Sequence, residues 1–164
     1  MTEPIRLHCE RLFDGDRFID DATVTISDGR IAGIESGLAA GSGATDLGSG
    51  TLAPGFIDLQ VNGGGGVLFN NDPSIPALNR IIEAHRRAGT TSLLPTLISD
   101  SPKIQRKGVA AVSKAIAAGE HSILGIHLEG PHLDTGRRGV HREEFVRPIG
   151  DDDEVVLMQA LSGG

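Results

Sequence analysis

The chain has 164 residues and a formal net charge of -7 at pH 7. This acidic balance, with no stripe rich in lysine and arginine, argues against a nucleic-acid partner. Cys9 is the single cysteine, which excludes an intrachain disulfide and fits a reducing cytoplasm. No apolar run approaches the roughly 20 residues that cross a bilayer, and no signal peptide is visible. We therefore expect a cytoplasmic globular protein with no membrane partner.

The first third of the chain has the pattern of short strands and tight turns. Residues 23–27 alternate polar and apolar side chains, as a half-buried strand does. Residues 27–30 have the composition of a turn, and residues 30–35 then predict the return strand of a hairpin. Asp14 and Gly15 mark another turn, whereas residues 37–50, rich in Gly, Ser and Ala, are expected to form a loop.

From Gly55 onward, short apolar runs alternate with segments of helical periodicity. Gly89 and Gly119 are expected to end the two helices. Ser101 has the position of an N-cap, with Pro102 as the first helical residue. Strands that alternate with helices indicate an α/β fold with parallel strands and right-handed crossovers. The expected strands are residues 56–61, 90–97 and 122–128; the helices begin near Pro73 or Ser74 and at Ser101.

Apolar and small side chains recur every three or four residues along both helices, which predicts one buried face for each. In the first helix these residues are Leu78, Ile81, Ile82, His85 and Ala88, and in the second Ile104, Gly108, Ala111, Val112, Ala115 and Ile116. A polar loop follows Pro131 and continues to about residue 150. The acidic run at 151–154 then favours a helix over residues 155–161. Three strands and two helices are too few for a closed eightfold barrel of about 250 residues, so we expect an incomplete domain.

His127 and Glu129 are two apart on the third expected strand, so their side chains share one face. Ligands bind at the carboxyl ends of parallel strands, where Glu129 is followed directly by Gly-Pro. Carboxylate and imidazole groups suit zinc or a similar divalent ion, or acid–base catalysis. The alternative is a buried histidine with a glutamate paired to a basic group.

Two further segments carry polar side chains at expected strand ends. Gln60 and Asn62 share a strand face and precede a run of glycines, so their amides could contact a ligand; a flexible loop is the alternative. In the later polar loop, His141 could polarise a carbonyl, and Arg137 and Arg138 could pair with a phosphate. The alternative for this loop is a solvated basic segment. His85 is expected to be a packed histidine, and His132 fits either interpretation.

Four segments together resemble the N-acetylglucosamine-6-phosphate deacetylases of the amidohydrolase superfamily. They are LAPGFIDLQVNG at 52–63, GTTSLLPT at 89–96, GIHLEGP at 125–131 and GVH at 139–141. The resemblance implies that residues 54–164 are the first part of an incomplete (β/α)8 TIM barrel, comprising three βα units. Residues 1–53 would then be the N-terminal strands of a small β-sandwich domain.

The resemblance also implies a site with one divalent metal ion, zinc-like or iron-like. Glu129 matches the carboxylate metal ligand, and His141 matches a histidine that contacts substrate near the acetamido carbonyl. Gln60 and Asn62 stand where many other amidohydrolases carry a pair of histidine ligands, and they are expected to contact substrate. The implied reaction hydrolyses N-acetylglucosamine 6-phosphate, a phosphorylated amino sugar, to glucosamine 6-phosphate and acetate.

The family's two histidine ligands and its catalytic aspartate lie on later barrel strands, so no catalytic residue is assigned here. Glu129 alone would hold a metal ion weakly, because zinc takes about four ligands. We therefore expect this chain to be a truncated and inactive portion of a homodimeric deacetylase. Two alternatives stay open: another amidohydrolase acting on a different amide, and a non-enzymatic remnant or one half of a split enzyme.

Overall fold

The computed structural model describes residues 3–37 and 43–150, and the chain divides into two compact units, Met1–Gly55 and Phe56–Gly164. The predicted helix at 155–161 lies outside the described residues. Within the described part of the chain, no helix is long and apolar enough to cross a membrane.

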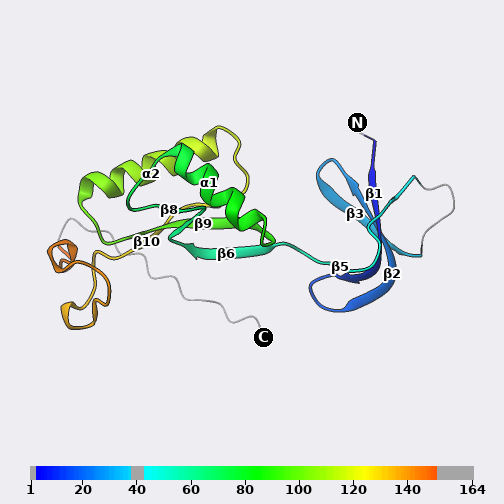
Figure 1. Cartoon of the computed structure of the whole chain (residues 1–164), viewed down its shortest axis with the longest axis horizontal. Coiled ribbons are helices and arrows are strands. Elements are labelled where there is room, and N and C mark those ends of the chain that lie inside the picture. Colours follow the sequence, from blue (N-terminus) through cyan, green and yellow to red (C-terminus); the bar gives the residue numbers. More distant parts are fainter. Residues whose placement is uncertain (1–2, 38–42, 151–164) are drawn as a thin grey trace. The chain divides into compact units, whose positions relative to one another are not determined.

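The N-terminal unit is built on an antiparallel meander of β1 (Ile5–Phe13), β2 (Phe18–Ser27) and β3 (Arg30–Ser36). Two short strands, β4 (Thr45–Asp46) and β5 (Thr51–Leu52), pair with β1 in parallel (Figure 1). The predicted hairpin is therefore confirmed. The expectation that residues 37–50 are entirely loop is wrong at β4, where backbone pairing with β1 overrides the polar composition.

The core of this unit is small and lies on one face of the meander. Its buried residues are Cys9, Leu12, Ala22 and Val24. The turn between β1 and β2 is closed by Asp14, whose carboxylate accepts hydrogen bonds from the backbone N–H groups of Arg17 and Asp16 at 2.9 Å each. These two hydrogen bonds hold the pKa of Asp14 below its ordinary value, and the bond from Arg17 has the larger effect.

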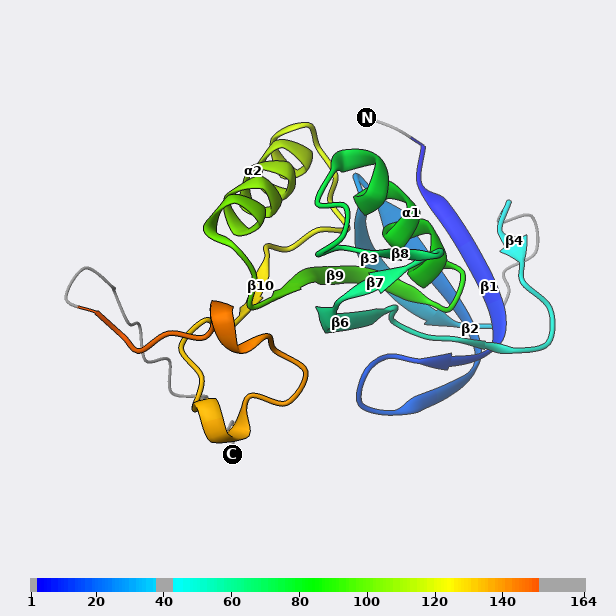
Figure 2. The same cartoon turned by 60° about the vertical axis from the view of Figure 1, so that its left-hand side comes forward.

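The C-terminal unit contains a parallel sheet in the order β10-β9-β6. Its strands are β6 (Phe56–Val61), β9 (Thr90–Ile98) and β10 (His127–Glu129), and its helices are α1 (Ile75–Arg86) and α2 (Pro102–Ala117). Both helices lie on one face of the sheet (Figures 1 and 2) and share one core. The alternating α/β order and the parallel strands predicted from the sequence are confirmed.

The helix starts and buried faces match the sequence pattern closely. Ser74 and Ser101 cap α1 and α2 by accepting from the backbone N–H groups of Ala77 and Ile104, and each cap is followed by proline within two positions. The core of the unit includes Leu78, Ile81, Ile82, Ala111, Val112 and Ala115. Ile116 and Ala88 are exceptions: Ile116 is 43% exposed, and Ala88 is exposed and lies beyond the end of α1, so their assignment to buried helix faces was wrong.

The third strand is shorter than predicted. Residues 122–128 were expected to form it, but β10 is limited to His127–Glu129, with an isolated bridge from Ile123 to Leu93. Gly125 lies between these two points of contact with β9, and glycine weakens strand pairing because it has no side chain to pack. The shortening leaves Glu129 at the carboxyl end of the sheet, as predicted.

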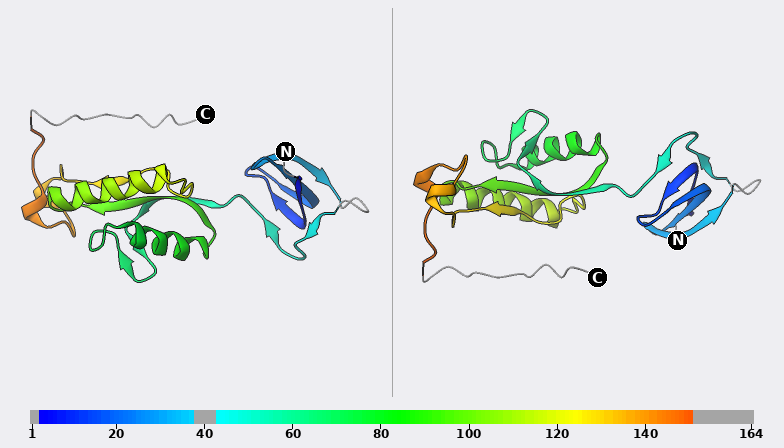
Figure 3. Two further views of the ribbon diagram at one scale, coloured as in Figure 1. Left: turned by 90° about the horizontal axis from the view of Figure 1, so that it is seen from above. Right: turned by 90° about the horizontal axis from the view of Figure 1, so that it is seen from below.

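Two small features flank the sheet. A hairpin of β7 (Gly63–Gly64) and β8 (Val67–Leu68) follows β6 and lies beside α1 (Figure 3). The polar segment after β10 contains two turns of 3-10 helix, η1 (Thr135–Arg137) and η2 (Glu143–Phe145). Both features follow the carboxyl end of a strand, so they lie where a ligand site is expected in a parallel sheet.

Candidate active site at the strand ends

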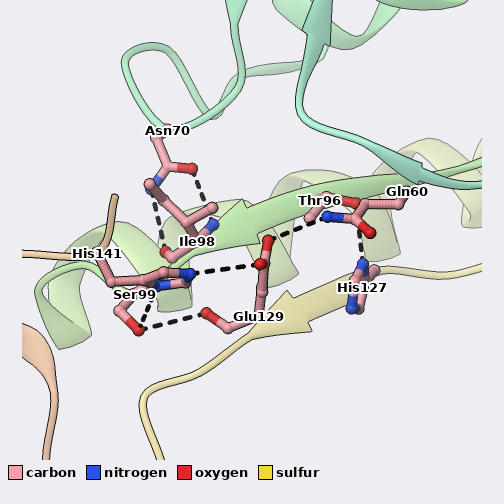
Figure 4. A network of polar contacts seen from close by, with 8 residues as sticks. All are labelled: Gln60, Asn70, Thr96, Ile98, Ser99, His127, Glu129 and His141. Atoms are coloured by element: carbon pink, nitrogen blue, oxygen red, sulfur yellow. Dashed lines mark hydrogen bonds and ion pairs between the residues drawn. The ribbon is translucent and has the colours of Figure 1, made fainter. Parts of the chain in front are cut away.

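The polar side chains of the candidate site come from the carboxyl ends of all three parallel strands (Figure 4). Gln60 lies near the end of β6, Ser99 follows β9 directly, and Glu129 ends β10. Parallel strands bring their carboxyl ends to one edge, which explains why residues so distant in sequence meet here. His141 joins them from the segment after β10.

Glu129 is the centre of this network. Its Oε2 accepts a hydrogen bond from Gln60 Nε2 at 3.2 Å, and its Oε1 lies 3.3 Å from His141 Nε2. The Glu129 side chain is 34% exposed, whereas His141 is buried. The carboxylate thus has a fixed orientation and still has lone pairs available on the open side of the site. The structure brings Gln60, Glu129 and His141 together at this edge of the sheet.

His141 is held from behind by Ser99. The Ser99 hydroxyl oxygen lies 2.9 Å from His141 Nδ1, and the Ser99 backbone N–H donates to the same nitrogen at 3.2 Å. The hydroxyl also lies within hydrogen-bond distance of the Glu129 backbone carbonyl, at 3.3 Å. Ser99 therefore connects the end of β9 to both partners of the Glu129–His141 contact.

His127 lies next to this network on the same strand as Glu129. Its Nδ1 is 3.2 Å from the Thr96 hydroxyl, which also lies 3.2 Å from the Leu94 carbonyl. The Thr96 hydroxyl can donate to the Leu94 carbonyl or to His127 Nδ1, and either arrangement leaves the imidazole in contact with Thr96. His127 is thus tied to β9 and not to Glu129, in agreement with its interpretation as a neighbour on the same face.

Two residues singled out in the sequence stand apart from the network. Asn62 is half-buried, and its backbone carbonyl accepts from Phe69 N at 2.8 Å; within the described residues no hydrogen bond links its side chain to Glu129. Arg138 pairs with Glu143 at 3.1 Å and donates to the Thr135 carbonyl. That arginine is therefore committed to the fold of its own segment.

Sequence reasoning missed Asn70, which fastens the loop after β6 to the end of β9. Its Oδ1 accepts from Ile98 N at 3.0 Å, and its Nδ2 donates to Ile98 O at 3.2 Å and to Asp100 Oδ2 at 3.1 Å. It also missed Ser99. A run of Ser, Asp and Ser after a predicted strand is the signal that could have drawn attention to this edge.

His85 is also more than a packed histidine. Its Nε2 lies 2.9 Å from the Gly63 carbonyl, so the last turn of α1 holds the start of the glycine run. The imidazole fits closely against Gly64, where an added Cβ would lie 3.0 Å from the ring. His85 therefore fixes the backbone that leaves β6 just beyond Gln60.

The described residues supply only part of a metal site. Among them, no group of three or more His, Cys, Asp and Glu side chains could hold a metal ion. Glu129 is a suitable oxygen ligand, but zinc usually takes about three protein ligands. Gln60 is a neutral amide, which is a weak substitute for imidazole on such an ion. The residues at this edge of the sheet therefore do not complete a metal centre.

Comparison with known proteins shows what the chain is similar to. No family model matches, but the chain is 40% identical over 144 residues to the N-acetylgalactosamine-6-phosphate deacetylase of Shewanella sp. (strain ANA-3), covering 85% of this chain and 36% of that protein. It is 38% identical over 112 residues to the N-acetylglucosamine-6-phosphate deacetylase of Haemophilus influenzae, covering 68% of this chain and 29% of that protein. Over the matched residues the chain is thus similar to amino-sugar-phosphate deacetylases, and it spans 36% and 29% of the lengths of these two relatives.

Solved structures agree with these sequence relatives. The N-acetylglucosamine-6-phosphate deacetylase of Pasteurella multocida matches with a TM-score of 0.81 and 30% identity, over 90% of this chain and 40% of that one. The Mycobacterium smegmatis enzyme matches with a TM-score of 0.80 and 29% identity, over 89% of this chain and 38% of that one. The chain is therefore a relative of the N-acetylglucosamine-6-phosphate deacetylases and resembles their N-terminal portion, spanning about two-fifths of their length at most.

Proposed function

We propose that this chain forms part of a deacetylase that hydrolyses the acetamido group of a 2-acetamido-2-deoxyhexose 6-phosphate, releasing acetate and the free amino sugar phosphate. The observation that carries the proposal is the contact between Glu129 and His141 at the strand ends, in a chain similar to such deacetylases over most of its length. N-acetylglucosamine 6-phosphate is the proposed substrate, because that sugar is named for most of the relatives.

The architecture proposed for the whole enzyme extends what the two units show. Residues 54–164 would be the first three βα units of a (β/α)8 barrel, and residues 1–53 the first strands of a β-sandwich. Support comes from the order β6-α1-β9-α2-β10, with all three strands parallel and both helices on one face. A barrel built in this way would have Gln60 and Glu129 at its carboxyl face, where barrel enzymes place their active sites.

Each residue at the strand ends has a proposed role. Glu129 would supply one ligand to a divalent metal ion, zinc-like or iron-like; such an ion, when bound, activates water and polarises a carbonyl. Gln60 orients the carboxylate by donating to its second oxygen. His141 would donate from Nε2 to the acetamido carbonyl oxygen and so stabilise negative charge that develops there. Asn62 and Gln60 would contact the sugar.

A chimera tests the proposal directly. This chain would replace the matching segment of the Pasteurella multocida deacetylase, and acetate release from N-acetylglucosamine 6-phosphate would be measured. We expect the folded chimera to hydrolyse the substrate, and Glu129→Gln to reduce kcat/KM at least about 1000-fold. Glu83→Gln, which removes an exposed carboxylate on α1, is the matched control and should leave the rate unchanged. A folded chimera without deacetylation would contradict the proposal.

The sugar epimer needs its own assay, because the Shewanella relative is named for N-acetylgalactosamine 6-phosphate. The chimera should be assayed on both sugar phosphates, which differ only in the configuration at C4. A higher kcat/KM for N-acetylgalactosamine 6-phosphate would make that sugar the assigned substrate. The proposed deacetylation would be unchanged.

A further inference from the structure

The orientation of His141 rests on a residue that no sequence motif indicated. Ser99 is almost fully buried at 2% exposure, and His141 at 6%, so water has little access to the contact between them. The Ser99 backbone N–H and the Ser99 hydroxyl both point toward His141 Nδ1, at 3.2 and 2.9 Å. Two groups of one residue thus converge on one ring nitrogen.

The backbone N–H decides which nitrogen of His141 carries the proton. An amide can only donate, so the nitrogen it faces must accept and cannot itself carry hydrogen. A neutral His141 is therefore protonated on Nε2, the nitrogen that lies 3.3 Å from Glu129 Oε1. The hydroxyl alone would not settle this, because it can rotate to donate or accept.

The Ser99 hydroxyl also lies near the end of β10. Its single proton can go to the unprotonated His141 Nδ1, 2.9 Å away, or to the backbone carbonyl of Glu129, 3.3 Å away, so the hydroxyl lies between the imidazole ring and the end of β10. It thereby couples the position of the imidazole ring to the end of β10, which carries the Glu129 carboxylate. Loss of the hydroxyl would leave the ring attached to β9 by the amide alone.

We infer that Ser99 is a positioning residue for His141: its amide fixes the Nε2–H tautomer, and its hydroxyl holds the ring against the end of β10. The inference rests on the proposed function, because the Nε2–H is the group that would donate to the acetamido carbonyl. Ser99 touches no substrate in this scheme and acts only through His141. The described polar contacts assign it no other partner than His141 and the Glu129 carbonyl.

Nitrogen-15 NMR of the histidine rings tests the inference on the 164-residue chain without any turnover. The chain would be labelled at its six histidines, and the His141 signals assigned by their loss in His141→Gln. We expect Nδ1 in the range of an unprotonated nitrogen and Nε2 bonded to hydrogen at neutral pH. A His141 protonated on Nδ1 would overturn the inference.

The hydroxyl is tested by the rate at which the His141 Nε2–H exchanges with solvent. Ser99→Ala keeps the amide, so the tautomer should persist, but exchange should accelerate at least about tenfold because one hydrogen bond is lost. Ser101→Ala, which removes only the N-cap hydroxyl of α2, is the matched control for general loosening. Equal exchange in Ser99→Ala and wild type, or equal acceleration in both variants, would overturn the positioning role.

These readouts separate the inference from the proposed function. A chimera that deacetylates neither sugar while the His141 tautomer is as expected would contradict the proposed function alone. An active chimera with His141 protonated on Nδ1 would contradict the inference alone.

Discussion

Glu129 Oε1 and His141 Nε2 lie 3.3 Å apart, although one residue ends a strand and the other belongs to the polar segment that follows it. The contact forms because Ser99 holds the imidazole from the opposite side. It gives the edge of the sheet one carboxylate that is fixed in orientation but still partly exposed. Several measurable properties depend on that arrangement.

The first prediction concerns metal affinity. Glu129→Ala should weaken Zn²⁺ binding by the chain at least about tenfold, because it removes the strand-end carboxylate proposed as a metal ligand. Gln60→Ala should change the affinity much less, since a neutral amide is a weak zinc ligand. Competition with a zinc indicator dye measures both. Glu83→Ala, which removes the same charge from an exposed position on α1, controls for net charge; an equal effect there would refute the assignment.

The second prediction concerns the glycine after Glu129. Gly130 has φ +87°, and a Cβ placed on it would lie 2.0 Å from the Ser99 hydroxyl oxygen. Gly119 has nearly the same φ, +89°, with nothing within 4 Å of an added Cβ. Both alanine variants incur backbone strain, but only Gly130→Ala adds a steric clash. Urea unfolding should show Gly130→Ala to be less stable than Gly119→Ala by about 1 kcal/mol or more. Equal losses of stability in the two variants would show that the Ser99 side chain moves away from the added methyl group at no energetic cost.

The third prediction concerns Asn70. Asn70→Asp replaces a donor to Ile98 O and Asp100 by an acceptor, so a carbonyl loses its partner and two carboxylates face each other. We expect a loss of about 2–4 kcal/mol in the free energy of unfolding. Asn71→Asp adds the same charge at an exposed neighbour and is the matched control. Thermal unfolding of the two variants side by side gives the answer, and similar stabilities would contradict the bridging role of Asn70.

The fourth prediction concerns pH. The Ser122 backbone N–H donates to Glu120 at 2.9 Å, and this bond, with smaller help from the Ser122 hydroxyl and Arg86, holds the pKa of Glu120 below its ordinary value of 4.5. A lowered carboxyl pKa in the folded state stabilises the protein above the unfolded-state pKa, and that contribution is lost as the pH falls through the lowered value. Glu120→Gln should therefore be less stable than wild type at pH 7, with the difference vanishing toward acidic pH. A difference that stays constant across a series of urea titrations would refute this.

Local patterns predicted the secondary structure of the C-terminal unit well. Ser74 and Ser101 predicted where both helices start, because an N-cap serine and the proline that follows it favour helix initiation within the first turn. The strand ending at Glu129 was predicted too long, because Gly125 has no side chain to pack and weakens the pairing with β9. The sequence pattern could not identify Ser99 and Asn70 as important residues, because their contacts form only where segments distant in sequence meet. Strand spacing and loop position made Gln60, Glu129 and His141 candidates, and the resemblance assigned their roles, which local periodicity cannot do.

The glycine run at 63–66 has a consequence for how this segment tolerates change. Added methyl groups at Gly63 and Gly65 would lie 2.2 and 2.9 Å from the backbone oxygens of Val67 and Arg80. At Gly64 the His85 ring is the obstacle, whereas Gly66 has open space around it but a φ of +78°, which strains any L side chain. A run with the composition of a flexible linker is therefore packed closely against neighbouring backbone and side-chain atoms. Alanine at Gly63, Gly64 or Gly65 would meet neighbouring atoms, whereas alanine at Gly66 would meet only the backbone strain of its positive φ.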